Sequence, residues 1–303
     1  MPPLPDGWHI LRFAVLAGSR LAVIGANADI HGAWRSDFNQ TTVGAALRAT
    51  AKATARVWIL GGDDLSLTES IEFPLLQQFP LVDQFPDGRW VVANARSEGQ
   101  GNARILGASG EEERRFELGD GIEHIKIDNQ SRIWIGWFDE GVFGNEGWRM
   151  PDRRWPPSVH GMAAFDDRGA LLMHARSKSV ADCYALNVSG NTAWACTYTD
   201  FPIWRINNDE ERTWPTYISG TRALAVSYPY VLAAGGYQEN ANRVVLLRLN
   251  GQSAKAAGEW RLPFGVGYPD NVSLVDGRDG ELHVVHDQQW HRWHIRTFIK
   301  GHD

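Results

Sequence analysis

The stretch DCYALNVSGNTAWACTYTDFPIWRINNDEERTWPTYI, residues 182–218, contains four short segments rich in apolar residues. Ser189 and Gly190 separate the first two segments, and a loop and a weaker hairpin follow. Short apolar runs bounded by Gly, Asn, Asp and Ser are typical of β-strands joined by turns. The stretch therefore predicts a four-stranded antiparallel sheet.

The same unit recurs along the chain. Its first strands are expected near Leu81, Ile122, Cys183, Ala223 and Val272, about 40 to 60 residues apart. Four short strands per repeat of about 40 residues indicate a β-propeller. We predict an all-β fold, a six-bladed β-propeller with four-stranded antiparallel blades, as one domain over 1–303. Its blades are expected at about 12–75, 79–118, 119–176, 181–218, 220–263 and 265–299, with insertions at 29–52 and 139–160.

The last repeat lacks a fourth strand, which would leave an open sheet edge. The N-terminal residues 5–11, which include DGWHIL, are predicted to supply that strand and close the ring. Large aromatic side chains fill the space between packed sheets. We expect this role for tryptophans in second and third strands: Trp58, Trp90, Trp134, Trp194 and Trp204.

Composition excludes several classes of function. The chain has 30 basic and 36 acidic residues and a net charge of −6, without a run of Lys or Arg that could neutralise several phosphates. No segment approaches 18 uninterrupted apolar residues, and the N-terminus lacks a basic region followed by an apolar one. We expect a cytoplasmic protein that binds neither nucleic acid nor membrane.

The two cysteines lie in one predicted hairpin. Counting outward from a turn at Ser189 and Gly190 places Cys183 opposite Cys196. A disulfide across this pair is one alternative. In a reducing compartment, two small core residues are the preferred interpretation.

Two segments resemble known propeller families. IKIDNQSRIWIGWFDEGVF, residues 125–143, resembles the repeat of streptogramin-lyase-like propellers and of sensor propellers in two-component regulators, with Gln130 and Ser131 in its turn. GYPDNVSLVDGRDGELHVV, residues 267–285, is similar to a segment of the gluconolactonase and regucalcin group, which is six-bladed and carries a divalent metal. Each resemblance covers one repeat.

The second resemblance implies a metal site. Asp270 matches a metal ligand of that group, and Asn271 stands where the group has glycine. Glu123 and Asp182 fall where the group has asparagine ligands. The implied cofactor is a divalent cation: calcium, magnesium, manganese or zinc. The N-terminal Glu-Gly-Pro segment of the group has no match here, and neither has the histidine on which the lyases depend.

Strand direction predicts that polar residues gather at one face. If each first strand begins at that face, the same face carries the blade-to-blade loops and the second-to-third-strand loops. Functional residues concentrate on such loops. Candidate proton-transfer residues are His124 and Asp139, and candidate metal ligands are Glu123, Asp182 and Asp270. Candidate binding residues are Glu140, His160, Asp200, Arg222, Tyr237 and Asn271.

Two functions fit this face. The first is a binding or scaffolding propeller that holds a small polar molecule or a protein partner. The second is a metal-dependent hydrolase, similar to the lactonases, or a lyase at the same channel mouth. Segments GxSxG, HExxH and GxxxxGK[ST] are absent from the sequence.

Overall fold

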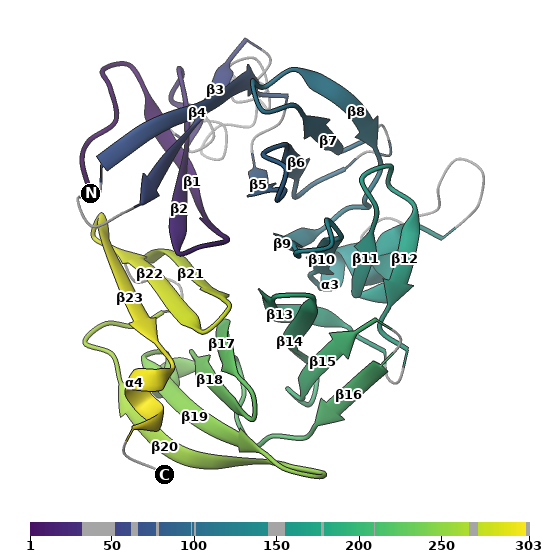
Figure 1. Cartoon of the computed structure of the whole chain (residues 1–303), viewed down its shortest axis with the longest axis vertical. Coiled ribbons are helices and arrows are strands. Elements are labelled where there is room, and N and C mark those ends of the chain that lie inside the picture. Colours follow the sequence, from purple (N-terminus) through teal and green to yellow (C-terminus); the bar gives the residue numbers. More distant parts are fainter. Residues whose placement is uncertain are drawn as a thin grey trace, which may run out of the picture.

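The computed structural model describes residues 1–31, 52–61, 66–76, 79–97, 99, 101–144, 155–176, 179–208, 210–266 and 272–300. Six antiparallel sheets are arranged in a ring (Figure 1), which confirms the predicted six-bladed, all-β propeller. In each sheet the strands follow chain order, so that every strand pairs with its neighbours in sequence.

The strands of the first three blades have the following bounds: β1 (His9–Leu16), β2 (Arg20–Ala26), β3 (Thr54–Gly61) and β4 (Ser66–Pro74); β5 (Pro80–Gln84), β6 (Trp90–Asn94), β7 (Ala103–Leu106) and β8 (Glu112–Phe116); β9 (Ile122–Ile127), β10 (Ile133–Trp137), β11 (Met162–Phe165) and β12 (Leu171–His174). Two short helices, α3 (Asp139–Phe143) and η1 (Pro157–His160), belong to the connection between β10 and β11.

The other blades contain β13 (Asp182–Ser189), β14 (Thr192–Tyr198), β15 (Ile203–Asn207) and β16 (Glu210–Trp214); β17 (Ala223–Ser227), β18 (Tyr230–Ala234), β19 (Arg243–Leu249) and β20 (Ala254–Arg261); β21 (Val272–Arg278), β22 (Glu281–His286) and β23 (Gln289–His294). The helices here are η2 (Gln238–Asn240) and α4 (Arg296–Ile299). None of the helices in the described ranges has the length and apolar character needed to span a bilayer.

Apolar side chains between adjacent blades hold the ring together. In the third blade, β10 (IWIGW) is buried at every position, whereas the outer strand β8 of the second blade (EERRF) is largely exposed. Trp134 packs with Cys183 and Trp204 between the third and fourth blades. All five tryptophans predicted to fill these spaces are at most 3% exposed. Burial between blades therefore dominates the stability of this fold.

Ring closure differs from the prediction. Residues 9–11, placed in a strand of the last blade, instead begin β1 and pair with β2 of the first blade. Within the described residues the last blade has three strands, β21 to β23. Leu4, Trp8 and Ile10 pack with Val285 in one apolar cluster, and the Met1 amino group donates to the Gln288 carbonyl at 2.8 Å. Side-chain packing, in place of a shared strand, joins the first and last blades.

The predicted pairing of the cysteines was wrong. The hairpin turns at Gly190 and Asn191, because Ser189 pairs with Thr192. A bulge at Tyr184 then places Cys183 opposite Thr197 and Cys196 opposite Ala185. Both cysteines are free and buried, and they lie in different apolar clusters. Burial raises the pKa of both thiols, that of Cys196 to about 12.

Strand order defines two ends of the central channel. The inner strands are β1, β5, β9, β13, β17 and β21, the first strand of each sheet. We call the end where they begin the loop face, because the connections between second and third strands lie there. The other end, with hairpins such as β5–β6 and β9–β10, is the turn face.

Candidate functional site

Three carboxylates meet at the loop-face mouth of the channel. Glu123 is the second residue of β9, Asp182 begins β13, and Asp139 begins α3. Burial raises the pKa of Asp182 to about 7, and the negative charges of Asp139 and Glu123 add to this effect, while Arg222 opposes it. The structure thus brings together four residues that were singled out in the sequence, from three different blades.

β-Bulges shape this mouth. Four inner strands carry one extra residue near their first end: Leu11, Glu123, Tyr184 and Ser273. A bulge redirects a side chain and is common beside active sites. Two of the four bulge residues, Glu123 and Tyr184, belong to the mouth.

Aromatic rings lie next to the carboxylates. Tyr184 and Phe201 contact each other, and each also contacts Tyr198 and Tyr237, with ring centroids 5.2 to 6.2 Å apart. The hydroxyl groups of Tyr184 and Tyr237 are hydrogen-bonded at 2.6 Å. The guanidinium of Arg222 lies 4.5 Å from the centroid of the Tyr184 ring. Tyr198 and Tyr237 are each more than 40% exposed, so this cluster presents ring surface to solvent.

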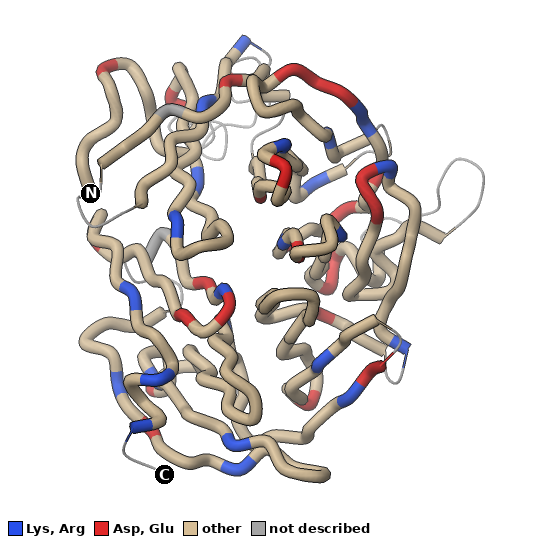
Figure 2. The backbone as a smooth tube through the Cα atoms, in the orientation of Figure 1, with Lys and Arg blue, Asp and Glu red and all other residues tan. Residues whose placement is uncertain are grey.

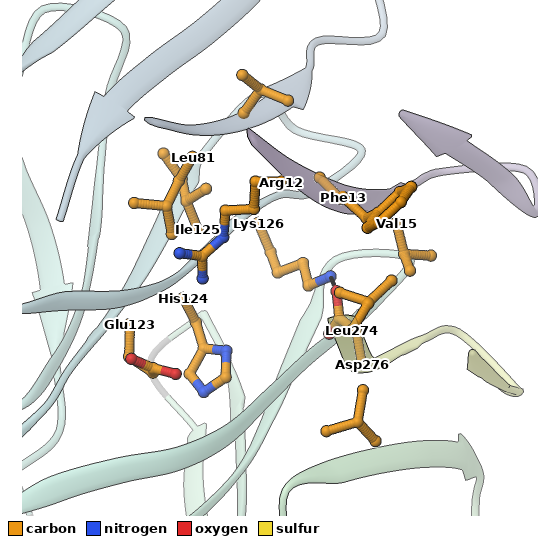
Figure 3. A pocket seen from close by; sticks show the side chains of 13 residues that line it. Arg12, Phe13, Val15, Leu81, Glu123, His124, Ile125, Lys126, Leu274 and Asp276 are labelled. Carbon is orange, nitrogen blue, oxygen red and sulfur yellow. Dashed lines mark hydrogen bonds and ion pairs between the residues drawn. The ribbon is translucent and has the colours of Figure 1, made fainter. Parts of the chain in front are cut away.

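Below the mouth, the channel narrows to a cavity of about 80 Å³ lined by residues of β1, β5, β9 and β21 (Figure 3). Arg12, Glu123 and His124 point into it, and Lys126 and Asp276 form an ion pair across it. The Lys126 and Asp276 side chains are 4% and 13% exposed. Lys126 follows His124 along β9, so this pair lies closer to the turn face than the mouth carboxylates do.

His124 lies at the centre of these groups. Its partner on β10 is Gly136, where a Cβ atom would lie 2.5 Å from the Cys183 Sγ atom, so the glycine allows β13 to pack closely beside this strand. Burial lowers the pKa of His124, so that the ring is neutral at pH 7. Its Nε2 atom is buried and has no hydrogen-bond partner among the described residues. A neutral ring with one open nitrogen can accept a proton or a hydrogen bond from a ligand.

Other predicted site residues lie elsewhere or are engaged. Glu140 forms an ion pair with Arg96 at 2.7 Å. His160 stacks on His174 of the outer strand β12, with ring centroids 4.0 Å apart. Asp200 is exposed in the β14–β15 connection. Asp270 and Asn271 lie outside the described residues.

Several residues of this site were missed in the sequence. Tyr184 belongs to the aromatic cluster because of the bulge at this residue. The local pattern of apolar and polar residues did not reveal that bulge. Lys126 and Asp276 could have been identified from the sequence. The side chain of a charged residue within an inner strand can point only into the channel or towards another blade. Among the described residues, no group of three or more His, Cys, Asp and Glu side chains is arranged to hold a metal ion.

Comparisons with known proteins support the fold. No protein-family model and no curated protein matches the chain. A catalytically inactive virginiamycin B lyase from Staphylococcus aureus with quinupristin is 9% identical, over 98% of this chain and 87% of that chain, with a TM-score of 0.52. This similarity in fold agrees with the streptogramin-lyase resemblance predicted from residues 125–143.

Two further structures have similar folds. Kluyvelomyces marxianus Hsv2 is 7% identical, over 94% of this chain and 76% of that chain, with a TM-score of 0.53. A chain of a mitotic checkpoint complex is 8% identical, over 96% of this chain and 79% of that chain, with a TM-score of 0.55. At these identities the comparisons define a class by fold alone, the β-propellers, a fold that hosts many functions.

Proposed function

We propose that this protein is a binding propeller that holds a small polar molecule at the loop-face mouth of its channel. The observation that carries the proposal is the placement of Asp182 beside Asp139 and Glu123: burial raises the pKa of Asp182 to about 7, and the two negative charges add to this effect. Like charges held together weaken a fold. Perturbed carboxylates in a cleft are therefore candidates for function.

The chemistry of the mouth favours a ligand with a positively charged group. Asp182 and Glu123 would attract that group, and the exposed faces of Tyr198 and Tyr237 would contact its methyl or methylene carbons. Arg222 would bind an anionic group on the same molecule. A bound cation favours the ionised form of Asp182, so binding at pH 7 should release a proton.

Thermal melts with three small molecules test this proposal. The probes are choline, which is a cation, glycine betaine, which is a zwitterion, and glucose, which is neutral. A ligand that binds the folded state alone raises the melting midpoint. We expect choline or betaine to raise it and glucose to leave it unchanged.

Matched variants locate the effect. Asp182→Asn should abolish the rise, whereas Asp6→Asn, at an exposed position of the N-terminal segment, should keep it. Binding of a charged ligand to the mouth is disproved if neither charged probe raises the midpoint, or if Asp182→Asn responds like the unchanged protein. A rise in the melting midpoint with glucose alone would indicate that the ligand is neutral and not charged.

A metal-dependent hydrolase or lyase is the second candidate, favoured by the proximity of Glu123 and Asp182. A divalent cation between these carboxylates would relieve their repulsion and could polarise a carbonyl group, while His124 accepts a proton. Melts of chelator-treated protein with calcium, magnesium, manganese or zinc test this function. A rise that Asp182→Asn removes would favour it, and no rise with any ion would count against it. A protein partner at the same face is the other form of the binding function; a mitotic checkpoint complex contains a chain of similar fold.

A further inference from the structure

A second cavity opens at the turn face, at the other end of the channel. Its volume is about 340 Å³, and it lies among the β1–β2, β5–β6, β9–β10 and β21–β22 hairpins. Figure 2 shows acidic and basic residues close together at the β21–β22 hairpin beside it. Two arginines line this cavity, Arg20 and Arg278, together with Gln84, Asp128 and Asn129.

The carboxylates near this cavity are already engaged. Asp83 accepts hydrogen bonds from Arg278 at 2.7 Å and from the backbone N–H groups of Ile127 and Gln84 at 2.6 and 2.8 Å. Asp128 is 2.5 Å from the Arg132 guanidinium and accepts a hydrogen bond from the Trp134 indole at 2.9 Å. The charges of Asp83 and Asp128 are thus balanced by one arginine each.

Glu281, at the start of β22, is a further carboxylate at this end of the channel. It accepts a hydrogen bond from the Ser19 hydroxyl, and it lies 3.6 Å from the imidazole of His283. It forms no ion pair with Arg20. Among the described residues, Arg20 therefore has no carboxylate in direct ion-pair contact.

The guanidinium of Arg20 has neutral partners. Its Nε atom donates to the Ala17 carbonyl at 3.0 Å, and its Nη1 atom donates to the Gln84 side chain at 2.9 Å. No carboxylate of the described residues lies within 4.0 Å of it, and its Nη2 atom has no described partner. Burial and the nearby positive charge of Arg278 lower the pKa of Arg20, and Asp83 opposes this. Two neighbouring guanidinium groups consequently share one carboxylate, Asp83.

We propose that the turn-face cavity binds a small oxyanion, a phosphate or carboxylate group, between Arg20 and Arg278. Such an ion would give Arg20 a direct ionic partner, and the planar guanidinium group suits two parallel hydrogen bonds to oxyanion oxygens. The Nη2 atom of Arg20 supplies an open donor. This site is separate from the loop-face mouth, because the Lys126–Asp276 pair lies between the two along the channel.

Isothermal titration calorimetry at constant ionic strength tests the site. The probes are sodium phosphate and sodium acetate, with sodium chloride as the reference for general salt effects. We expect saturable binding of phosphate, acetate or both, and none for chloride. Binding of phosphate alone would assign a phosphate site, and binding of acetate would extend it to carboxylates.

Two arginine variants decide where the anion binds. Arg20→Gln removes the proposed anion-binding guanidinium without removing either member of the Asp83–Arg278 pair, and it should weaken binding at least about tenfold, which corresponds to about 1.4 kcal/mol. Arg248→Gln removes an exposed arginine that lies 5.9 Å from the Tyr230 ring, and it should leave binding unchanged. Far-ultraviolet circular dichroism checks that both variants are folded. The proposal is overturned if neither oxyanion binds, if chloride binds equally, or if Arg20→Gln retains full affinity.

Discussion

Charged side chains are arranged in opposite ways at the two ends of the channel: they are paired at one end and repel each other at the other. At the turn face, Asp83 and Arg278 are 1% and 4% exposed and form an ion pair. At the loop face, Asp182 has two acidic neighbours, Asp139 and Glu123, and no ion pair within 4.0 Å among the described residues. The turn-face pair comes from β5 and β21, whereas the mouth carboxylates come from β9, β13 and α3.

This contrast separates the charges that hold the ring from those available to a ligand. Asp83 belongs to the second blade and Arg278 to the last, and both also bond to the backbone of Ile127 in the third. Removing one of these groups breaks a link between three blades. Removing one carboxylate at the mouth relieves repulsion instead. Substitutions at the two ends should therefore change stability with opposite signs.

The largest effect is expected for Arg278→Met. This change leaves Asp83 as a buried charge without its cationic partner, and breaking a buried pair in this way costs about 3 to 5 kcal/mol. Urea unfolding, followed by tryptophan fluorescence, measures the loss in the free energy of unfolding.

Two control variants accompany this measurement. Arg222→Met at the mouth should cost about 1 kcal/mol or less, since this exposed side chain loses a contact with the Tyr184 ring and a solvent-screened attraction to Asp182. The double variant Asp83→Leu with Arg278→Met should recover part of the loss, because no unpaired charge remains. A cost below about 1 kcal/mol for Arg278→Met would mean that the pair does not hold the blades together.

The sequence predicted the fold better than it predicted the contacts between side chains. Repeats of about 40 residues with four strands each depend on local patterns, so the six blades could be identified. Sorting loops by strand direction also placed Glu123, Asp139 and Asp182 at one face. Ring closure was less accessible, because residues 9–11 fit a strand of either the first or the last blade.

The errors at the site have a common physical cause. Tyr184 was missed and the Cys183 pairing was shifted because of a turn one residue away and a bulge, neither of which alters the alternation of apolar residues enough to be recognised. Glu140 pairs with Arg96 of another blade, and His160 stacks on His174 of an outer strand. Such partners depend on tertiary packing, which one sequence without relatives does not reveal.

A smaller effect, of opposite sign, is expected for Asp182→Asn. The pKa of an unfolded aspartate is about 3.9, and that of Asp182 in the folded protein is raised to about 7. Between these values the folded state binds more protons than the unfolded state, so the contribution of Asp182 to stability falls as pH rises. Asp182→Asn has no titrating group at this position, so it does not lose stability in this way as pH rises.

We expect the two proteins to be about equally stable near pH 4, and the variant to be more stable above pH 7. Solvent screening at this partly exposed position limits the gain to about 1 to 2 kcal/mol. Urea unfolding between pH 4 and 8 measures it, with Asp6→Asn, at an exposed position away from the mouth, as the control that should show no such change. If the difference between Asp182→Asn and the unchanged protein did not vary with pH, the three carboxylates would not be coupled.

The smallest effect is expected for Tyr237→Phe, which removes the 2.6 Å hydrogen bond to Tyr184 at the mouth. Burial raises the pKa of the Tyr184 hydroxyl, and this hydrogen bond adds to the effect. The variant should therefore lower the pKa of Tyr184 and cost about 1 kcal/mol or less in stability, because Tyr237 is partly exposed. Tyrosine absorbance during a pH titration measures the pKa, and Tyr217→Phe, at an exposed ring outside this cluster, is the control. A Tyr184 pKa that stays the same in Tyr237→Phe would show that burial alone sets it, and that the two rings do not form one binding surface.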